Sequence, residues 1–162
     1  MTAATEVDGQ ARALVAALLR AGATLATAES LTGGRLAAVV TSVPGASAVF
    51  RGGVVAYATD LKAELLGVDL DLLQRVGPVD PDVATAMARG VRDRMRATYG
   101  VATTGVAGPE QQDGHPVGEV YVAVAGPDRA LVRAFSFTGD RESVRRATVV
   151  EALSAVAREL PL

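Results

Sequence analysis

TLATAESLTGGRLAAVV, residues 24–40, decides the fold of this chain. Residues 24–28 form a short apolar run and predict a buried strand. Ser30, Thr32, Gly33 and Gly34 then make a polar, glycine-rich turn, and the apolar spacing that follows predicts a helix ending near Pro44. Strand, turn and helix in this order form the repeating unit of α/β folds.

Further elements of an α/β fold lie on both sides of this segment. Residues 54–58 predict a second strand, and Thr59 and Asp60 offer an N-cap for a helix over residues 61–67. Upstream, apolar residues recur at helical spacing from Val7 to Leu19, and Gly22 ends the run. The chain is therefore built from alternating strands and helices.

The second half of the chain adds a helix, a central strand and a hairpin. Asp80-Pro81 opens a helix that runs down to Gly100, and residues 101–105 predict a central strand. A polar loop over residues 106–115 is closed by Pro116. Strands at 119–125 and 130–137 flank a Gly-Pro-Asp-Arg turn, and a last helix begins near Gly139-Asp140 and runs almost to Pro161.

These elements predict an α/β fold, a three-layer α/β/α sandwich around a mixed, mostly parallel sheet of about five strands. The 162 residues suit a single domain, which we expect to span residues 1–162. A hydrophobic content of 49% excludes a disordered chain.

Charge and composition exclude several classes of function. The formal net charge of −2 gives no positive field that would attract nucleic acid, so we expect no nucleic-acid partner. With no cysteine and one histidine, the usual zinc ligand sets are missing, and we expect no metal. The chain has no apolar run of membrane-spanning length and no basic leader, so we expect a cytoplasmic protein without a membrane partner.

Ligands of such sheets lie beyond the carboxyl ends of the parallel strands, which here are the turns at 29–34, 57–62 and 104–116. Ser30 stands at the first of these turns. The N–H groups of Thr32, Gly33 and Gly34 could hold an oxyanion or a phosphate. Alternatively, Ser30 and Thr32 are ordinary helix caps.

Lys62 is the best candidate partner for a serine nucleophile. It falls in the first turn of a helix, five residues after Tyr57, where both the helix dipole and burial would lower the pKa of its amine. A neutral lysine can act as a base. The alternative is a lysine whose stem lies along the helix surface with its amine in water.

Other polar residues leave two interpretations open. Arg145 lies on the inward face of the last helix, where it could bind a substrate anion or pair with Glu29 or Glu142. Thr104 and Gly105 end the central strand and could orient a polar ligand or only shape a turn.

Taken together, five motifs resemble the C-terminal domain of the competence/damage-inducible CinA family, the nicotinamide-nucleotide amidohydrolases, over nearly the whole chain. The motifs are Ala28-Glu29-Ser30-Leu31-Thr32-Gly33-Gly34, Tyr57 with Lys62, Thr104-Gly105-Val106-Ala107-Gly108-Pro109, Pro116-Val117-Gly118, and Arg141-x-x-x-Arg145.

The resemblance implies a role for each matching residue. Ser30 would be the nucleophile, Lys62 its general base, and Tyr57 would assist proton transfer or positioning. Thr104, Gly105 and Arg145 would line the ligand site, while the oxyanion role of residues 32–34 is our own inference. The implied reaction converts nicotinamide mononucleotide and water to nicotinate mononucleotide and ammonia, with no metal or other cofactor.

Two positions depart from the family pattern. Family members usually carry glycines after Gly108-Pro109 and a lysine before the Pro-Val-Gly motif, where this chain has Glu110-Gln111-Gln112 and His115. His115 itself fits a solvated loop histidine. The larger family proteins also carry an N-terminal domain, whose activity we expect to be absent here.

Two other functions stay open on the sequence. The chain could be a non-catalytic, nucleotide-sensing or accessory domain of the same fold, since a fold does not guarantee its chemistry. It could also hydrolyse another small anionic amide, with Arg145 holding a carboxylate in place of a phosphate. For the assembly we expect a homodimer.

Overall fold

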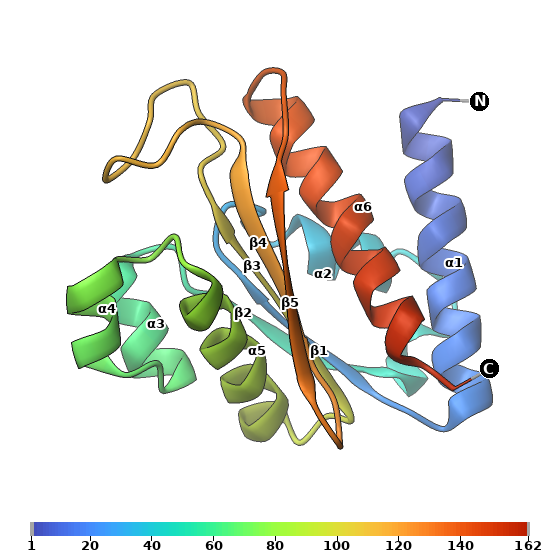
Figure 1. Cartoon of the computed structure of the whole chain (residues 1–162). Coiled ribbons are helices and arrows are strands. Elements are labelled where there is room, and N and C mark those ends of the chain that lie inside the picture. The colour runs from blue at the N-terminus through green and yellow to red at the C-terminus, as the bar shows by residue number, and fades with distance from the viewer. Residues whose placement is uncertain (1, 162) are drawn as a thin grey trace.

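The structure is a computed structural model that describes residues 2–161, and its centre is one five-stranded sheet (Figure 1). The strand order is β2-β1-β3-β4-β5. The strands are β1 (Leu25–Glu29), β2 (Phe50–Val55), β3 (Tyr99–Gly105), β4 (Glu119–Ala125) and β5 (Ala130–Ser136).

Strand directions make the sheet mixed. β1 pairs in parallel with both β2 and β3, while β4 runs antiparallel to β3 and β5. All strands except β4 therefore point the same way. The α/β fold with a mostly parallel mixed sheet is the one that the sequence predicts.

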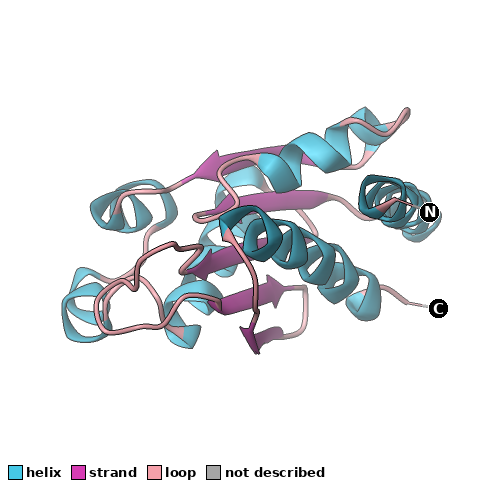
Figure 2. Ribbon diagram, turned by 90° about the horizontal axis from the view of Figure 1, so that it is seen from above, coloured by secondary structure: helices cyan, strands magenta, loops and turns pink. Residues whose placement is uncertain are grey.

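Helices cover both faces of the sheet, as the view from above shows (Figure 2). One face carries α1, α2 and α6, and the other carries α3, α4 and α5. The helices are α1 (Ala3–Ala21), α2 (Arg35–Thr41), α3 (Thr59–Leu66), α4 (Leu70–Val76), α5 (Pro81–Met95) and α6 (Arg141–Glu159), and a short 3₁₀ helix spans Ala46–Ala48. None of the helices described in residues 2–161 is long and apolar enough to cross a membrane.

Small side chains set the spacing between the layers. The core between the sheet and α3, α4 and α5 is rich in alanine, for example Ala26 and Ala28 of β1 and Ala102 of β3, all fully buried. Gly90 of α5 faces the end of α3, where a Cβ atom would lie 1.9 Å from the Leu66 carbonyl oxygen. α3 therefore packs directly on the backbone of α5.

Several predicted boundaries are wrong. The second strand is Phe50–Val55 instead of residues 54–58, because its two glycines lie inside the strand. A Cβ on Gly53 would lie 2.3 Å from Thr27 Oγ1 of β1, so the glycine allows close strand packing. The helix opened by Pro81 ends at Met95, where Arg96 turns the backbone into the left-handed region with a φ of 52°. The N-cap of α3 is also different: it is Ala58 instead of Thr59 or Asp60.

One α-helix was not predicted at all, and neither was the short 3₁₀ helix. α4 spans seven residues behind the N-cap Asp69, and of these only Leu73 is fully buried. A helix of two turns gives too short an apolar pattern to separate it from a loop.

Candidate active site

A cavity of about 310 Å³ opens at the carboxyl ends of the parallel strands. Ser30 and Leu31 follow β1, Tyr57 follows β2, and residues 105–112 follow β3, while Arg141 begins α6. The structure thus brings together the three turns that the strand order singles out. The volume is at the lower end of the range for small-ligand sites.

A larger cavity of about 510 Å³ lies elsewhere, between α1, α2 and α6. Its lining is mainly apolar, and two of its charged residues, Arg35 and Glu142, already form an ion pair at 2.6 Å. Neither Ser30 nor Lys62 lines it. Chemistry therefore belongs to the smaller cavity.

Ser30 and Lys62 form a hydrogen-bonded pair at the base of the smaller cavity. Lys62 Nζ lies 3.1 Å from Ser30 Oγ. Ser30 is 9% exposed, whereas Lys62 is fully buried, with no exposed surface. The serine hydroxyl therefore reaches the cavity while the lysine approaches it from behind.

Two backbone carbonyls complete the surroundings of the lysine amine. Nζ donates to Ala56 O at 2.7 Å and to Tyr57 O at 3.4 Å. A neutral amine keeps two N–H bonds and one lone pair. The ammonium form donates to Ser30 Oγ as well, whereas in the neutral form, with two N–H groups on the carbonyls, the lone pair would face the hydroxyl of Ser30.

Burial also shifts the protonation of this amine. Loss of hydration disfavours the ammonium form and lowers the pKa of Lys62 from 10.5 to about 8. At pH 7 roughly a tenth of the molecules then carry the neutral amine. Among the 16 basic side chains of the chain, Lys62 is the only lysine, and arginines cannot lose a proton in this range.

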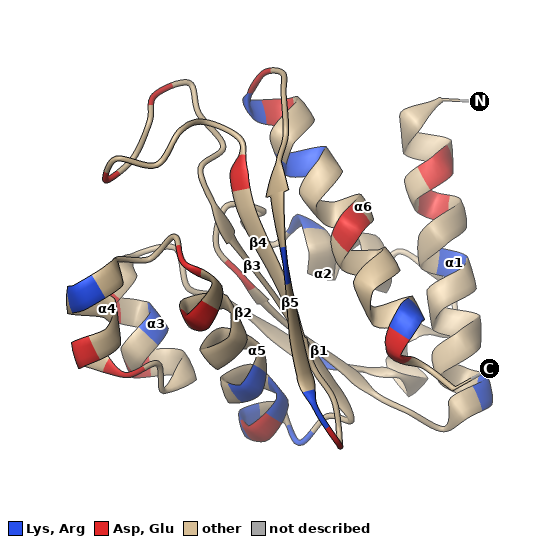
Figure 3. Ribbon diagram, viewed as in Figure 1, with Lys and Arg blue, Asp and Glu red and all other residues tan. Residues whose placement is uncertain are grey.

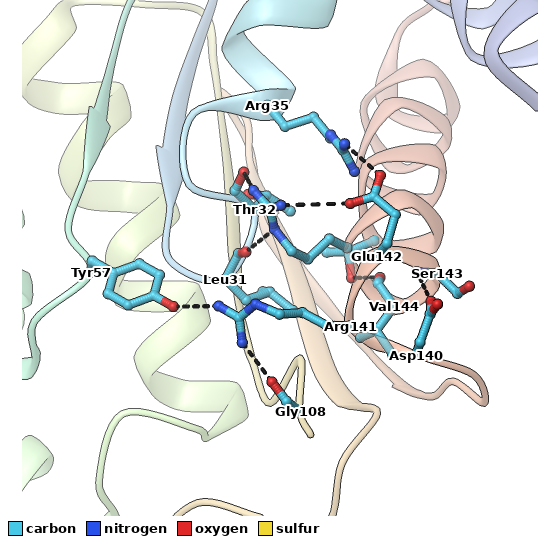
Figure 4. A network of polar contacts seen from close by, with 12 residues as sticks. Leu31, Thr32, Arg35, Tyr57, Gly108, Asp140, Arg141, Glu142, Ser143 and Val144 are labelled. Carbon is cyan, nitrogen blue, oxygen red and sulfur yellow. Dashed lines mark hydrogen bonds and ion pairs between the residues drawn. The ribbon is translucent and has the colours of Figure 1, made fainter. Parts of the chain in front are cut away.

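Tyr57 and Arg141 both line the cavity, and their side chains point toward each other (Figure 4). Arg141 donates through Nη2 to the Tyr57 hydroxyl at 2.9 Å and through Nη1 to Gly108 O at 2.6 Å. Because the arginine donates to the phenol oxygen, the proton of Tyr57 stays free to be donated. Tyr57 is 58% exposed, so a ligand can reach its ring.

Comparison with known proteins gives the family. The model of the CinA C-terminal domain matches residues 8–160, which is nearly the whole chain. The chain belongs to the CinA C-terminal domain family. A CinA-like protein of Frankia casuarinae is 54% identical over 143 residues, 88% of this chain and 33% of that protein. A CinA-like protein of Parasynechococcus marenigrum is 46% identical over 96% of this chain and 38% of its own length.

Solved CinA structures share the fold. A competence/damage inducible protein from Agrobacterium tumefaciens superposes with a TM-score of 0.91 at 35% identity, covering 94% of both chains. A CinA superfamily protein from Escherichia coli gives 0.92 at 32% identity, covering 95% of this chain and 90% of the other. The chain spans about a third of the length of the curated relatives it matches.

The glycine-rich turn of this CinA domain does not line the cavity. The carboxylate of buried Glu29 accepts from Leu36 N at 2.8 Å and Ala37 N at 3.1 Å, so it occupies the start of α2. Thr32 is buried and its hydroxyl bonds to that of Thr103 at 2.8 Å. Gly33 N–H donates to Ser30 O. Residues 32–34 therefore support Ser30 from outside the cavity.

Arg145 and Thr104 likewise lie outside the lining. Arg145 donates through Nε to Leu31 O at 2.9 Å and through Nη2 to Thr32 O at 3.1 Å, and its Nη1 lies 3.8 Å from Glu142. The Thr104 hydroxyl donates to Pro78 O at 2.7 Å. Gly105, in contrast, lines the cavity. Arg145 thus holds the turn after Ser30, and Arg141 is the arginine that lines the cavity.

Sequence reasoning missed three residues that shape the site. Arg141 lies one helical turn before Arg145, and that spacing was the available signal for it. Leu31 and Glu110 also line the cavity. Leu31 lies within the motif around Ser30, and Glu110 stands where family members usually carry a glycine, but neither position had been given a role. Within residues 2–161 no group of three or more His, Asp or Glu side chains could hold a metal ion.

Proposed function

We propose that this CinA domain hydrolyses the carboxamide of nicotinamide mononucleotide to nicotinate mononucleotide and ammonia. The observation that carries the proposal is the Ser30–Lys62 pair, in which a fully buried amine with a pKa of about 8 lies 3.1 Å from a hydroxyl that reaches a cavity. A serine next to a neutral amine is an activated nucleophile. The pyridine mononucleotide is the substrate that the family resemblance implies.

The first step forms an ester with the serine. Ser30 Oγ attacks the carboxamide carbon, and its proton moves to the lone pair of Lys62 Nζ. The carbonyl oxygen becomes an oxyanion, which needs an N–H donor beside it. We assign this role to Leu31 N–H, because Leu31 follows the nucleophile, lines the cavity, and has no backbone acceptor for its N–H within residues 2–161.

The second step releases ammonia and restores the serine. As the carbon–nitrogen bond breaks, the departing NH₂ group takes the proton of the Lys62 ammonium, either directly or through the Tyr57 hydroxyl, which donates its own proton and is reprotonated by Lys62, and leaves as ammonia. Water then attacks the ester carbon, Lys62 accepts its proton, and the acid leaves as Ser30 regains its hydrogen. Each proton taken by Lys62 is returned within the cycle.

Arg141 is the group that we assign to the substrate phosphate. Its partners are a carbonyl oxygen and a phenol oxygen, so its charge has no carboxylate within 4.0 Å among the described residues. Arginine binds phosphate through paired N–H donors. A phosphate held by Arg141 would direct the attached ring toward Ser30.

Ammonia release from a panel of amides tests the proposal. The purified protein is incubated with nicotinamide, nicotinamide riboside, nicotinamide mononucleotide and NAD, and we expect the mononucleotide to give the highest kcat/KM. Ser30→Ala should lose turnover and keep its fold, because it removes only the attacking hydroxyl. Ser47→Ala changes an exposed serine that does not line the cavity and should behave as wild type.

Two results would count against this function. Full activity of Ser30→Ala would exclude the ester intermediate. Binding of the mononucleotide without release of ammonia would instead favour the non-catalytic, nucleotide-sensing alternative.

A further inference from the structure

Two charged side chains of opposite sign line the catalytic cavity. Arg141 at the start of α6 is the cation, and Glu110 in the loop between β3 and β4 is the anion. All other lining side chains are neutral. In Figure 3, acidic positions of this loop lie above the sheet, across from the start of α6, where basic and acidic positions occur together.

Neither charge is neutralised by the protein. Among residues 2–161, the Arg141 guanidinium donates hydrogen bonds only to Gly108 O and the Tyr57 hydroxyl. Glu110 has no cationic group within 4.0 Å among residues 2–161, so it does not pair with Arg141 either. In contrast, Glu119 at the end of the same loop is paired with His115. The cavity thus keeps one free positive and one free negative charge.

The loop that carries Glu110 is held at several points. Gln112 and His115 exchange backbone hydrogen bonds of 3.1 and 2.8 Å around a tight turn. At its base, Gly118 N donates to Val106 O at 2.8 Å, and a Cβ on Gly108 would lie 2.7 Å from Val117. The carboxylate of Glu110 is therefore carried by an ordered wall of the cavity.

A ligand with both charges fits such a cavity better than a neutral amide. In an N-ribosylated pyridine carboxamide with a 5′-phosphate, the ring nitrogen carries a permanent positive charge and the phosphate is anionic. We propose that Glu110 is a specificity-determining residue that recognises the positive charge of the pyridinium ring, while Arg141 takes the phosphate. This inference rests on the proposed function and assigns the cationic half of its substrate.

Equilibrium binding to the inactive protein tests the role of Glu110 without turnover. In the Ser30→Ala background, calorimetry compares nicotinamide mononucleotide with its isosteric benzamide analogue, in which a ring carbon replaces the charged nitrogen. Adding Glu110→Gln should weaken binding of the cationic ligand about three- to fivefold, the upper part of the range for an exposed charge pair. Binding of the neutral analogue should change less than about twofold.

Asp113→Asn is the matched control. Asp113 is an acid of the same loop that does not line the cavity, and asparagine tolerates its φ of 50°. The control should leave both affinities unchanged. An equal loss for both ligands in Glu110→Gln, or the same loss in Asp113→Asn, would overturn the assignment of Glu110 alone. Failure of the Ser30→Ala protein to bind either ligand would overturn the proposed function and this assignment with it.

Discussion

At the scale of single residues, the site depends on one amine kept out of water. Lys62 is fully buried, and its amine has two carbonyls and one hydroxyl as partners and no carboxylate within 4.0 Å among the described residues. A carboxylate partner would hold the ammonium form and raise the pKa, whereas carbonyls alone leave the cost of desolvation in place. The environment thus favours a base over a salt bridge.

Two arginines one helical turn apart should behave differently when removed. Arg141→Ala should lower kcat/KM for the mononucleotide about ten- to a hundredfold, because a charge-assisted bond to phosphate contributes about 1.5 to 3 kcal/mol. The loss should be much smaller for nicotinamide riboside, which has no phosphate. Initial rates of ammonia release with the two substrates measure the ratio.

Arg145→Ala is the counterpart of this variant. Arg145 holds the carbonyls of Leu31 and Thr32, so its loss should lower kcat for both substrates alike and reduce stability by about 1 to 3 kcal/mol. If Arg145→Ala lowered kcat/KM only for the phosphorylated substrate, and Arg141→Ala did not, the phosphate would be assigned to Arg145, as the sequence first suggests.

The sequence predicts the types of these residues better than their contacts. Ser30, Tyr57 and Lys62 fall on turns that the strand order brings together, so their meeting could be expected. Whether Lys62 is buried or lies along the surface depends on side chains far along the chain, which spacing does not show. Spacing likewise does not show which of Arg141 and Arg145 lines the cavity, since both lie on one helix face.

At the scale of elements, α3 is placed by its contact with α5. α3 carries Lys62 and ends at Leu66. A Cβ atom added at Gly90 would lie only 1.9 Å from the carbonyl oxygen of Leu66. Gly90→Ala must therefore push α3 away, which should cost about 1 to 3 kcal/mol and lower kcat by moving Lys62 from Ser30. Denaturant unfolding and ammonia release measure the two effects.

Gly9→Ala provides the matched helix variant. Gly9 lies inside α1 with no atom within 4 Å of its added Cβ, so alanine should raise stability by about 0.5 to 1 kcal/mol and leave activity unchanged. Equal stability of Gly90→Ala and wild type would show that α3 does not depend on this contact.

The strand–turn–helix unit around Ser30 illustrates what an element pattern can and cannot predict. Its strand and helix follow from apolar spacing, and both are present as β1 and α2. That spacing does not show which group accepts the hydrogen bonds of the N–H groups at the start of α2. Glu29 ends the strand, and only the folded structure shows that its carboxylate accepts hydrogen bonds from the N–H groups of Leu36 and Ala37.

At the scale of the whole molecule, the buried amine should destabilise the folded protein at neutral pH. The pKa of Lys62 is about 8 when folded and 10.5 in its ordinary state, so between these values the unfolded chain binds more protons. Stability of the wild type should then rise by roughly 3 kcal/mol relative to Lys62→Met as the pH increases from 7 to 10.5.

Denaturant unfolding of both proteins at pH 7 and near pH 10 measures this difference. Comparison with Lys62→Met removes the contribution of every other titrating group, because both proteins share those groups. Lys62→Met should also lack activity at all pH values. A stability difference that stays constant with pH would mean that the amine keeps an ordinary pKa in the folded protein.

Direct titration of Lys62 tests the central claim most closely. Because the chain has a single lysine, protein labelled with ¹³C at the lysine Cε gives one NMR resonance for this amine. The buried amine should titrate with a midpoint near pH 8, and kcat/KM should rise through the same pH as the amine becomes neutral. A midpoint near 10.5, or a kcat/KM that does not follow the titration, would contradict a lysine base at Ser30.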